Sequence, residues 1–128
     1  MNNVSPRIIA EIGNSHEGSL GIALSMISMA ADAGADIVKF QFHISEYEST
    51  LDEPFRDQTF IQDLSRKQYW ERVSFSKDEW VKIFKHCEKN NIEFLCTPFS
   101  LEAAQILFEN GLIKPKSHIT HKNPIFSR

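Results

Sequence analysis

The feature that most constrains the fold of this chain is the alternation of short apolar runs with longer segments of helical period. The short runs are rich in β-branched and aromatic residues and predict strands at 7–12, 36–42 and 92–97. Strands that alternate with helices pair in parallel through right-handed crossovers. The pattern therefore predicts an α/β fold. It leaves two architectures open, a doubly wound open sheet and part of a (β/α)8 barrel.

Each predicted helix begins at a serine that can cap it and ends near a glycine or an asparagine. The predicted helices cover residues 19–34, 76–90 and 100–111. Ser76 and Glu79 also fit the S-x-x-E capping box. Residues 43–75 show no clear period, and we expect a long loop there over one mouth of the fold, with a helical turn at 66–71. Its aromatic residues could close over a ligand or equally cover the edge of a barrel.

Composition and charge exclude several classes of function. The formal net charge of −3 gives no broad basic surface, so nucleic acid is not an expected partner. No apolar run approaches the roughly 20 residues of a membrane span, and the N-terminus does not resemble a secretory signal. Cys87 and Cys96 are interpreted as reduced core thiols of a cytoplasmic protein. No glycine-rich nucleotide-binding motif follows the first strand.

Four polar side chains are expected at the carboxyl ends of the strands: Glu11, Lys39, Gln41 and Thr97. Side chains alternate along a strand, so Lys39 and Gln41 share one face, and the apolar residues between them face the helices. Each of the four residues could be structural, for example as an ion pair. Together they indicate an anionic ligand at the end of the sheet where both candidate folds bind ligands.

The histidines carry weaker signals. His16 is interpreted as a polar loop residue that fixes a turn, and His43 could line the mouth next to the second strand. His86 is expected to be exposed on its helix. No H-E-x-x-H spacing occurs, and no metal ligand is assigned to this chain.

Three blocks of sequence occur in a recognisable order and spacing. They read IAEIGN followed by HEGS within 9–19, AGAD leading into VKFQ within 33–41, and FLCTPFS at 94–100. Together they resemble the N-acetylneuraminate synthase family, which includes the synthases of sialic, legionaminic and pseudaminic acids. The resemblance covers about residues 7–112 and implies about the first three β/α units of a (β/α)8 barrel.

The resemblance also implies an activity and a set of roles. Members of the family are homodimers that condense phosphoenolpyruvate with an N-acylated hexosamine and release phosphate, with a divalent metal, manganese or magnesium, polarising the sugar aldehyde. By resemblance, Lys39 and Thr97 would hold phosphoenolpyruvate and Gln41 would line the shared pocket. Glu11 would be the catalytic acidic residue near the reacting atoms. The metal is not expected to be held by this part of the barrel.

The resemblance stops after residue 112, and residues 113–128 are expected to form a divergent, disordered or accidental tail. Since a full barrel takes about 250 residues, we expect a truncated, frameshifted or split gene product that is inactive alone. Its exposed parallel edge should make it prone to aggregation. Two alternatives remain, a non-catalytic fragment that assembles with another barrel segment and a small α/β domain that binds phosphorylated metabolites.

Overall fold

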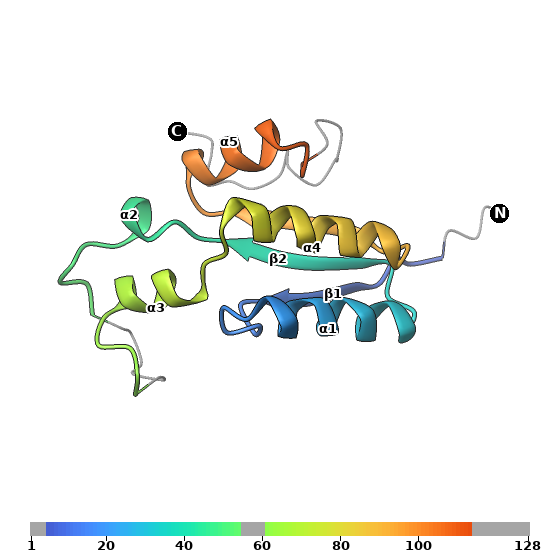
Figure 1. The fold of residues 1–128 in the computed structure, drawn as a ribbon, viewed down its shortest axis with the longest axis horizontal. Helices are drawn as coiled ribbons and strands as arrows, with labels where there is room; N and C mark the ends of the chain where they lie inside the picture. Colours follow the sequence, from blue (N-terminus) through green and yellow to red (C-terminus); the bar gives the residue numbers. More distant parts are fainter. Residues whose placement is uncertain (1–4, 55–60, 114–128) are drawn as a thin grey trace.

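A parallel sheet of three strands in the order β1-β2-β3 organises the fold. The computed structural model describes residues 5–54 and 61–113, and Figure 1 shows the arrangement of its elements. The strands are β1 (Ile9–Gly13), β2 (Ile37–Phe42) and β3 (Glu93–Pro98). The helices are α1 (Leu20–Asp32), α2 (Ser45–Glu48), α3 (Arg66–Val73), α4 (Lys77–Lys89) and α5 (Leu101–Glu109). The predicted α/β class and parallel pairing are therefore confirmed.

The serine caps predicted from the sequence are all present. Ser19, Ser76 and Ser100 each accept a backbone N–H of the first helical turn, at the starts of α1, α4 and α5. Ser76 and Glu79 form the complete capping box. These caps satisfy N–H groups that have no partner inside a helix, and so they set where each helix begins.

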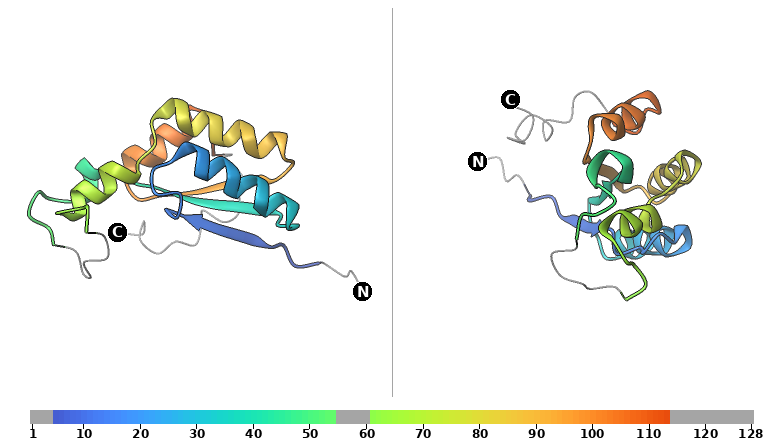
Figure 2. Two further views of the ribbon diagram at one scale, coloured as in Figure 1. Left: turned by 60° about the horizontal axis from the view of Figure 1, so that its bottom comes forward. Right: turned by 90° about the vertical axis from the view of Figure 1, so that its left-hand side faces the viewer.

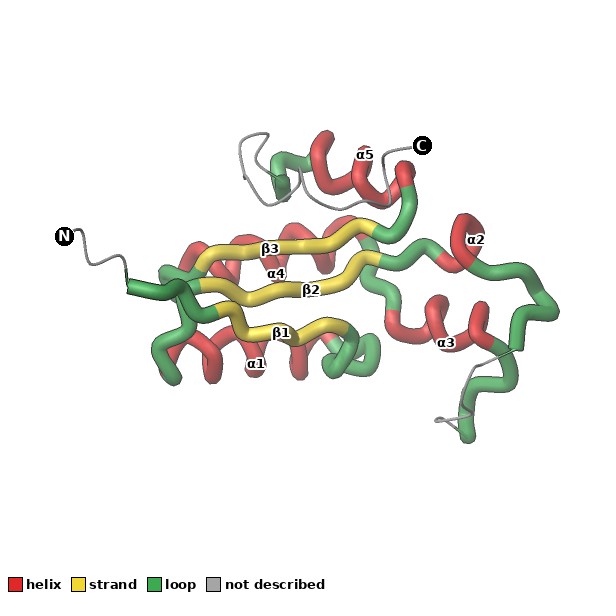
Figure 3. Tube along the Cα trace, turned by 180° about the vertical axis from the view of Figure 1, so that it is seen from behind, coloured by secondary structure: helices red, strands yellow, loops and turns green. Residues whose placement is uncertain are grey.

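The two faces of the sheet differ in what covers them. Both α1 and α4 lie on the same face, as the views in Figures 2 and 3 show. Within the described residues no helix lies across the other face. A strand order that advances without reversal places successive right-handed crossovers on one side, whereas a doubly wound sheet reverses its order and carries helices on both faces.

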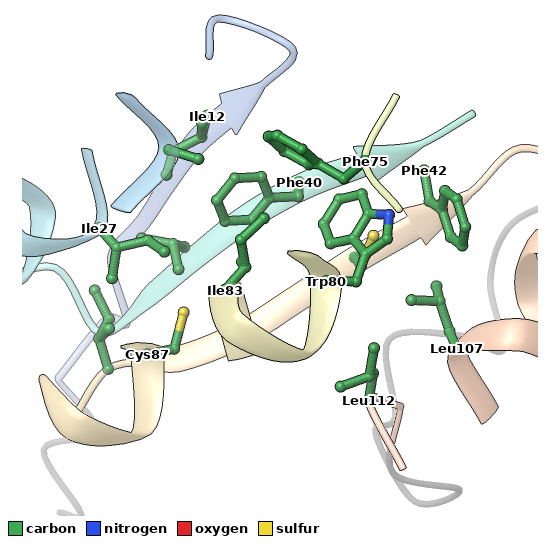
Figure 4. Close-up of a cluster of buried hydrophobic side chains, with 14 of the residues drawn as sticks. Ile12, Ile27, Phe40, Phe42, Phe75, Trp80, Ile83, Cys87, Leu107 and Leu112 are labelled. Atoms are coloured by element: carbon green, nitrogen blue, oxygen red, sulfur yellow. The ribbon is translucent and has the colours of Figure 1, made fainter. Parts of the chain in front are cut away.

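The hydrophobic core fills the space between the sheet and its helices (Figure 4). Trp80 on α4 packs at 5.2–5.9 Å, between ring centroids, against Phe40 and Phe42 of β2 and against Phe75. The apolar residues of β2 thus face the helices as predicted, because every second side chain of a strand points to the same face. Cys87 and Cys96 are free and buried in this core, which confirms that they are core residues.

The segment between β2 and α4 is more helical than the sequence indicated. The predicted turn at 66–71 belongs to α3, and α2 was not predicted. Both helices lie beyond the carboxyl ends of the strands (Figures 1 and 3). Arg72 of α3 binds Glu17 in the loop after β1, and it also binds the buried Asp63. The segment is therefore attached to the end of the sheet where the site was predicted.

Two sequence predictions need comment. His86 was expected to be exposed, but it is only partly exposed and its Nε2 lies 2.9 Å from Ser28 Oγ of α1. That expectation was wrong because α1 packs against α4 on this side. The predicted tail, from residue 114 on, lies outside the described residues. No helix in the described part of the chain is long and apolar enough to cross a membrane.

Candidate ligand-binding site at the carboxyl ends of the strands

An ion pair on the uncovered face of the sheet joins the first two strands. Glu11 and Lys39 are register partners in β1 and β2, and Lys39 Nζ lies 2.6 Å from Glu11 Oε2. Their side chains are 45% and 34% exposed, so both groups remain accessible to a ligand. A surface ion pair of this kind contributes only about 0–1 kcal/mol to stability. The presence of this ion pair is therefore poorly explained by its contribution to the stability of the fold.

Gln41 and Thr97 continue the same face toward the carboxyl ends. They are register partners in β2 and β3, and both are partly buried. Because Gln41 is two residues from Lys39, their side chains point to the same side of the sheet. Cys96 faces the core, so its neighbour Thr97 faces the opposite way, beside Gln41. The structure thus places all four predicted residues on one face. Gln41 and Thr97 lie toward the carboxyl ends as predicted, whereas Glu11 and Lys39 lie near the middle of their strands.

A bulge in β1 shapes the space between these groups. The register shifts between Glu11 and Gly13, and Gly13 has a φ of +56°. A Cβ atom at Gly13 would lie 3.4 Å from Glu11 Oε1 and 3.6 Å from Gln41 Nε2. The carboxylate and the amide therefore border the same space above Gly13. The sequence showed Gly13 only as the end of a strand.

Three further residues, Asn14, His43 and Glu48, lie at the site. Asn14 had no role assigned from the sequence, and Glu48 was not singled out. Asn14 Nδ2 donates to Gln41 Oε1 at 3.2 Å, and His43 Nε2 lies 3.2 Å from the same oxygen. His43, which could line the mouth, is buried, with Nδ1 2.7 Å from Glu48 Oε1. The only sequence signal of Glu48 is a position five residues after a histidine, and such spacing is uninformative before α2 is known.

His16 is a structural residue of the loop after β1, as interpreted. It is buried against Phe75, and its Nδ1 accepts a hydrogen bond from Gly18 N at 3.1 Å. Burial lowers the pKa of His16 to about 4, so its ring is neutral near pH 7. Burial likewise raises the pKa of the Cys87 thiol to about 12, and that thiol is not a nucleophile.

The site offers groups suited to an anion and to acid–base chemistry. The lysine ammonium, the threonine hydroxyl and the glutamine amide can donate hydrogen bonds to a phosphate or carboxylate. The glutamate can accept or deliver a proton. In the part of the chain that the structure describes, no group of three or more His, Cys, Asp or Glu residues could hold a metal ion.

These features define an α/β protein with a cluster of polar residues on the uncovered face of its parallel sheet. The sequence model of the NeuB family matches residues 26–125, and the chain belongs to this family. It is 40% identical over 108 residues to the N,N'-diacetyllegionaminic acid synthase of Campylobacter jejuni, covering 82% of this chain and 32% of that protein. It is 31% identical over 110 residues to the human N-acetylneuraminate-9-phosphate synthase, covering 80% of this chain and 29% of that protein.

Solved structures of related proteins support the same family membership. The N-acetylneuraminic acid synthetase of Leptospira borgpetersenii, crystallised with citrate, superposes with a TM-score of 0.64 and 32% identity. The match covers 87% of this chain and 37% of that one. The spore coat polysaccharide biosynthesis protein SpsE of Bacillus subtilis gives a TM-score of 0.58 at 26% identity, covering 86% and 28% of the two chains. The chain thus spans about a third of the length of the relatives it matches.

Proposed function

We propose that this chain is the phosphoenolpyruvate-binding part of a transferase that condenses phosphoenolpyruvate with an N-acylated hexosamine. Membership of the NeuB family supports the reaction class, as do relatives named as synthases of legionaminic acid and N-acetylneuraminate 9-phosphate. In this proposal Lys39 and Thr97 hold phosphoenolpyruvate and Gln41 lines the pocket. Glu11 is the catalytic acidic residue beside the reacting atoms.

The observation that carries the proposal is the ion pair between Glu11 and Lys39 on the uncovered face. The Lys39 ammonium lies 2.6 Å from a carboxylate, and 34% of its side chain is exposed, so it is held in place but still able to bind a second anion. Phosphoenolpyruvate carries both a phosphate and a carboxylate. An anion bound at Lys39 would lie against Glu11. Gln41 and Thr97 lie two residues further along β2 and β3, on the same face of the sheet.

The described elements correspond, in this proposal, to the first three β/α units of a (β/α)8 barrel. Two observations support it. Both α1 and α4 cover one face of the sheet, as helices cover the outside of a barrel. The polar residues occupy the other face, which in a barrel is the interior. The described residues do not fit the manganese or magnesium ion that the resemblance implies, and no step is assigned to a metal here.

Two further properties belong to the same proposal. A cytoplasmic location is supported by two free cysteines buried in the core, since reduced thiols persist in a reducing compartment. Binding without turnover is expected of this chain, because three strands supply one part of a barrel interior that eight strands complete. The resemblance also implies a homodimer.

Titration of the chain with phosphoenolpyruvate in a calorimeter tests the proposal. We expect weak binding that Lys39→Ala reduces about tenfold or more, because a charge-assisted hydrogen bond contributes about 1.5–3 kcal/mol. Lys82→Ala, which removes an exposed lysine from α4, is the matched control and should bind as the original chain does. Equal affinity of the Lys39→Ala and Lys82→Ala variants would disprove the site. Sugar-acid formation by the original chain alone would disprove the expected lack of turnover.

A further inference from the structure

Phe99 lies at the carboxyl end of β3, just beyond the polar residues of the site. Its backbone N–H donates a hydrogen bond to the carbonyl of Phe42 at 3.1 Å, which continues the pairing of β2 with β3 past the last pair of the ladder. Gln41 and Thr97 form the pair before that last one. The sheet therefore fixes the backbone of Phe99 two residues beyond Thr97, roughly 7 Å further along the strand.

The ring of His43 determines on which side of the sheet the Phe99 ring lies. His43 Nε2 is 3.2 Å from the side-chain oxygen of Gln41, so the His43 ring lies next to a side chain of the uncovered face. The rings of His43 and Phe99 stack, with their centroids 4.1 Å apart and 23° between their planes. The Phe99 ring consequently lies on the same side of the sheet as the polar residues of the site.

A stack of three rings supports Phe99. Trp70 of α3 also stacks on His43, at 3.7 Å between ring centroids and 12° between planes. Two rings so close and so nearly parallel to a third must occupy its opposite faces. His43, in the middle, is 5% exposed, whereas Phe99 is 46% exposed. Since one face of the Phe99 ring rests on His43, its opposite face is the one open to a ligand.

An exposed aromatic ring on a rigid support suits a neutral ligand that has C–H groups. Ligand sites combine aromatic walls with a few polar groups, and the face of an aromatic ring carries partial negative charge that attracts C–H hydrogens. Because its neighbours already hold the Phe99 ring, little conformational freedom is lost when a ligand binds to it. The ring has no hydrogen-bond donor for a phosphate or carboxylate, so it complements the anion site and does not extend it.

We propose that Phe99 binds the acceptor sugar of the reaction by stacking on the C–H groups of its carbon chain. The inference rests on the proposed function, in which an N-acylated hexosamine reacts with phosphoenolpyruvate. The two substrates must touch, so the sugar has to lie beside an anion bound at Lys39 and Thr97. Phe99 is the apolar surface that follows Thr97 along the same strand, and it can hold the sugar there without competing for the anion.

Nuclear Overhauser effects between the protein and N-acetylmannosamine, an N-acylated hexosamine, test the contact in the full 128-residue chain. We expect effects between C–H protons of the sugar and the ring protons of Phe99, which are identified by their loss in Phe99→Leu. The contact involves no charge, so it should persist in Lys39→Ala and at high salt, whereas phosphoenolpyruvate binding should weaken under both conditions. No effect between the sugar and the Phe99 ring in the original chain would overturn the inference.

Sugar affinity gives the second test. Phe99→Leu keeps an apolar side chain but removes the ring, and it should weaken sugar binding about three- to tenfold without changing the affinity for phosphoenolpyruvate. Phe99→Tyr, which keeps the ring, should bind the sugar as the original chain does. The matched control is Phe108→Leu, at a phenylalanine of α5 that is 60% exposed.

Two outcomes separate this inference from the proposed function. Equal sugar affinity of the Phe99→Leu and Phe108→Leu variants would contradict the role of Phe99, even if phosphoenolpyruvate binds at Lys39. Failure of the original chain to bind phosphoenolpyruvate would contradict the proposed function, while the contact between the sugar and the Phe99 ring would still be measured. If Phe99→Leu did not fold, the Overhauser effects in the original chain and the affinity of Phe99→Tyr would decide the question.

Discussion

At the scale of single residues, burial keeps the ring of His16 neutral near pH 7. His16 is 1% exposed, and its pKa falls from the ordinary 6.5 to about 4 because burial disfavours the charged ring. Its contribution to the loop after β1 is the hydrogen bond that Nδ1 accepts from Gly18 N. Protonation of Nδ1 would remove that acceptor. The neutral ring is therefore the form that folds.

His16 predicts a loss of stability in mild acid. Between pH 6.5 and pH 4 the unfolded chain binds the histidine proton and the folded chain does not, so the free energy of unfolding falls as the pH is lowered through this window. At about 1.4 kcal/mol per pH unit, the loss over these 2.5 units is about 3.5 kcal/mol at most. Urea unfolding at several pH values measures it. His16→Asn, which keeps a neutral acceptor for Gly18, should flatten the dependence; an unchanged slope would exclude His16 as its source.

At the scale of elements, the attachment of α3 to the sheet depends on one glycine. Gly18 has a φ of +77°, and a Cβ atom there would lie 2.1 Å from the backbone oxygen of Arg72. The same arginine binds Glu17 with its side chain. The loop after β1 and the last turn of α3 therefore touch backbone to backbone, and this contact holds α3 beyond the ends of the strands (Figure 1).

Gly18→Ala is expected to destabilise the chain more than Gly34→Ala. Both positions have positive φ, which costs a residue with a Cβ atom about 1–2 kcal/mol. At Gly18 the added Cβ atom would also clash with the backbone oxygen of Arg72, which adds about 1–3 kcal/mol. At Gly34 nothing lies within 4 Å of the added atom, so no clash is expected there. Chemical unfolding of both variants measures the difference. Equal losses would show that α3 is not held against this loop.

At the scale of the whole molecule, one edge of the sheet leaves apolar side chains in water. The strand order makes β1 an edge strand. Ile9 on β1 is 45% exposed, and Met29 on α1 is 69% exposed. An uncovered strand edge flanked by apolar residues is a template for association with another chain. In the proposed barrel, a further β/α unit would lie against this edge.

We therefore expect the isolated chain to associate as its concentration rises. Ile9→Lys should reduce the association, since a lysine on an edge strand opposes pairing with a second chain. Phe108→Lys, at a residue of α5 that is 60% exposed, is the control for added charge alone. Sedimentation velocity over a range of concentrations measures the effect. A chain that stays monomeric throughout, or one that both substitutions affect equally, would contradict this role of the β1 edge.

Local signals predicted most of the elements and the composition of the site. Ser76 and Glu79 predicted the start of α4 because a capping box involves only neighbouring residues. Lys39 and Gln41 were placed on one face by the alternation of a strand. In contrast, α2 was missed because a helix of four residues carries no periodicity, and the position of His86 depended on a neighbouring helix 58 residues away.

By itself, the sequence determined the α/β class, the parallel pairing of the strands and the grouping of Glu11, Lys39, Gln41 and Thr97 in one part of the sheet. These follow from short-range patterns and from the geometry that every parallel sheet shares. Only the tertiary structure decided that Asn14, His43 and Glu48 join Gln41. Their contacts depend on where α3 and Phe99 press on the His43 ring, and packing between distant segments leaves no periodic trace in the sequence.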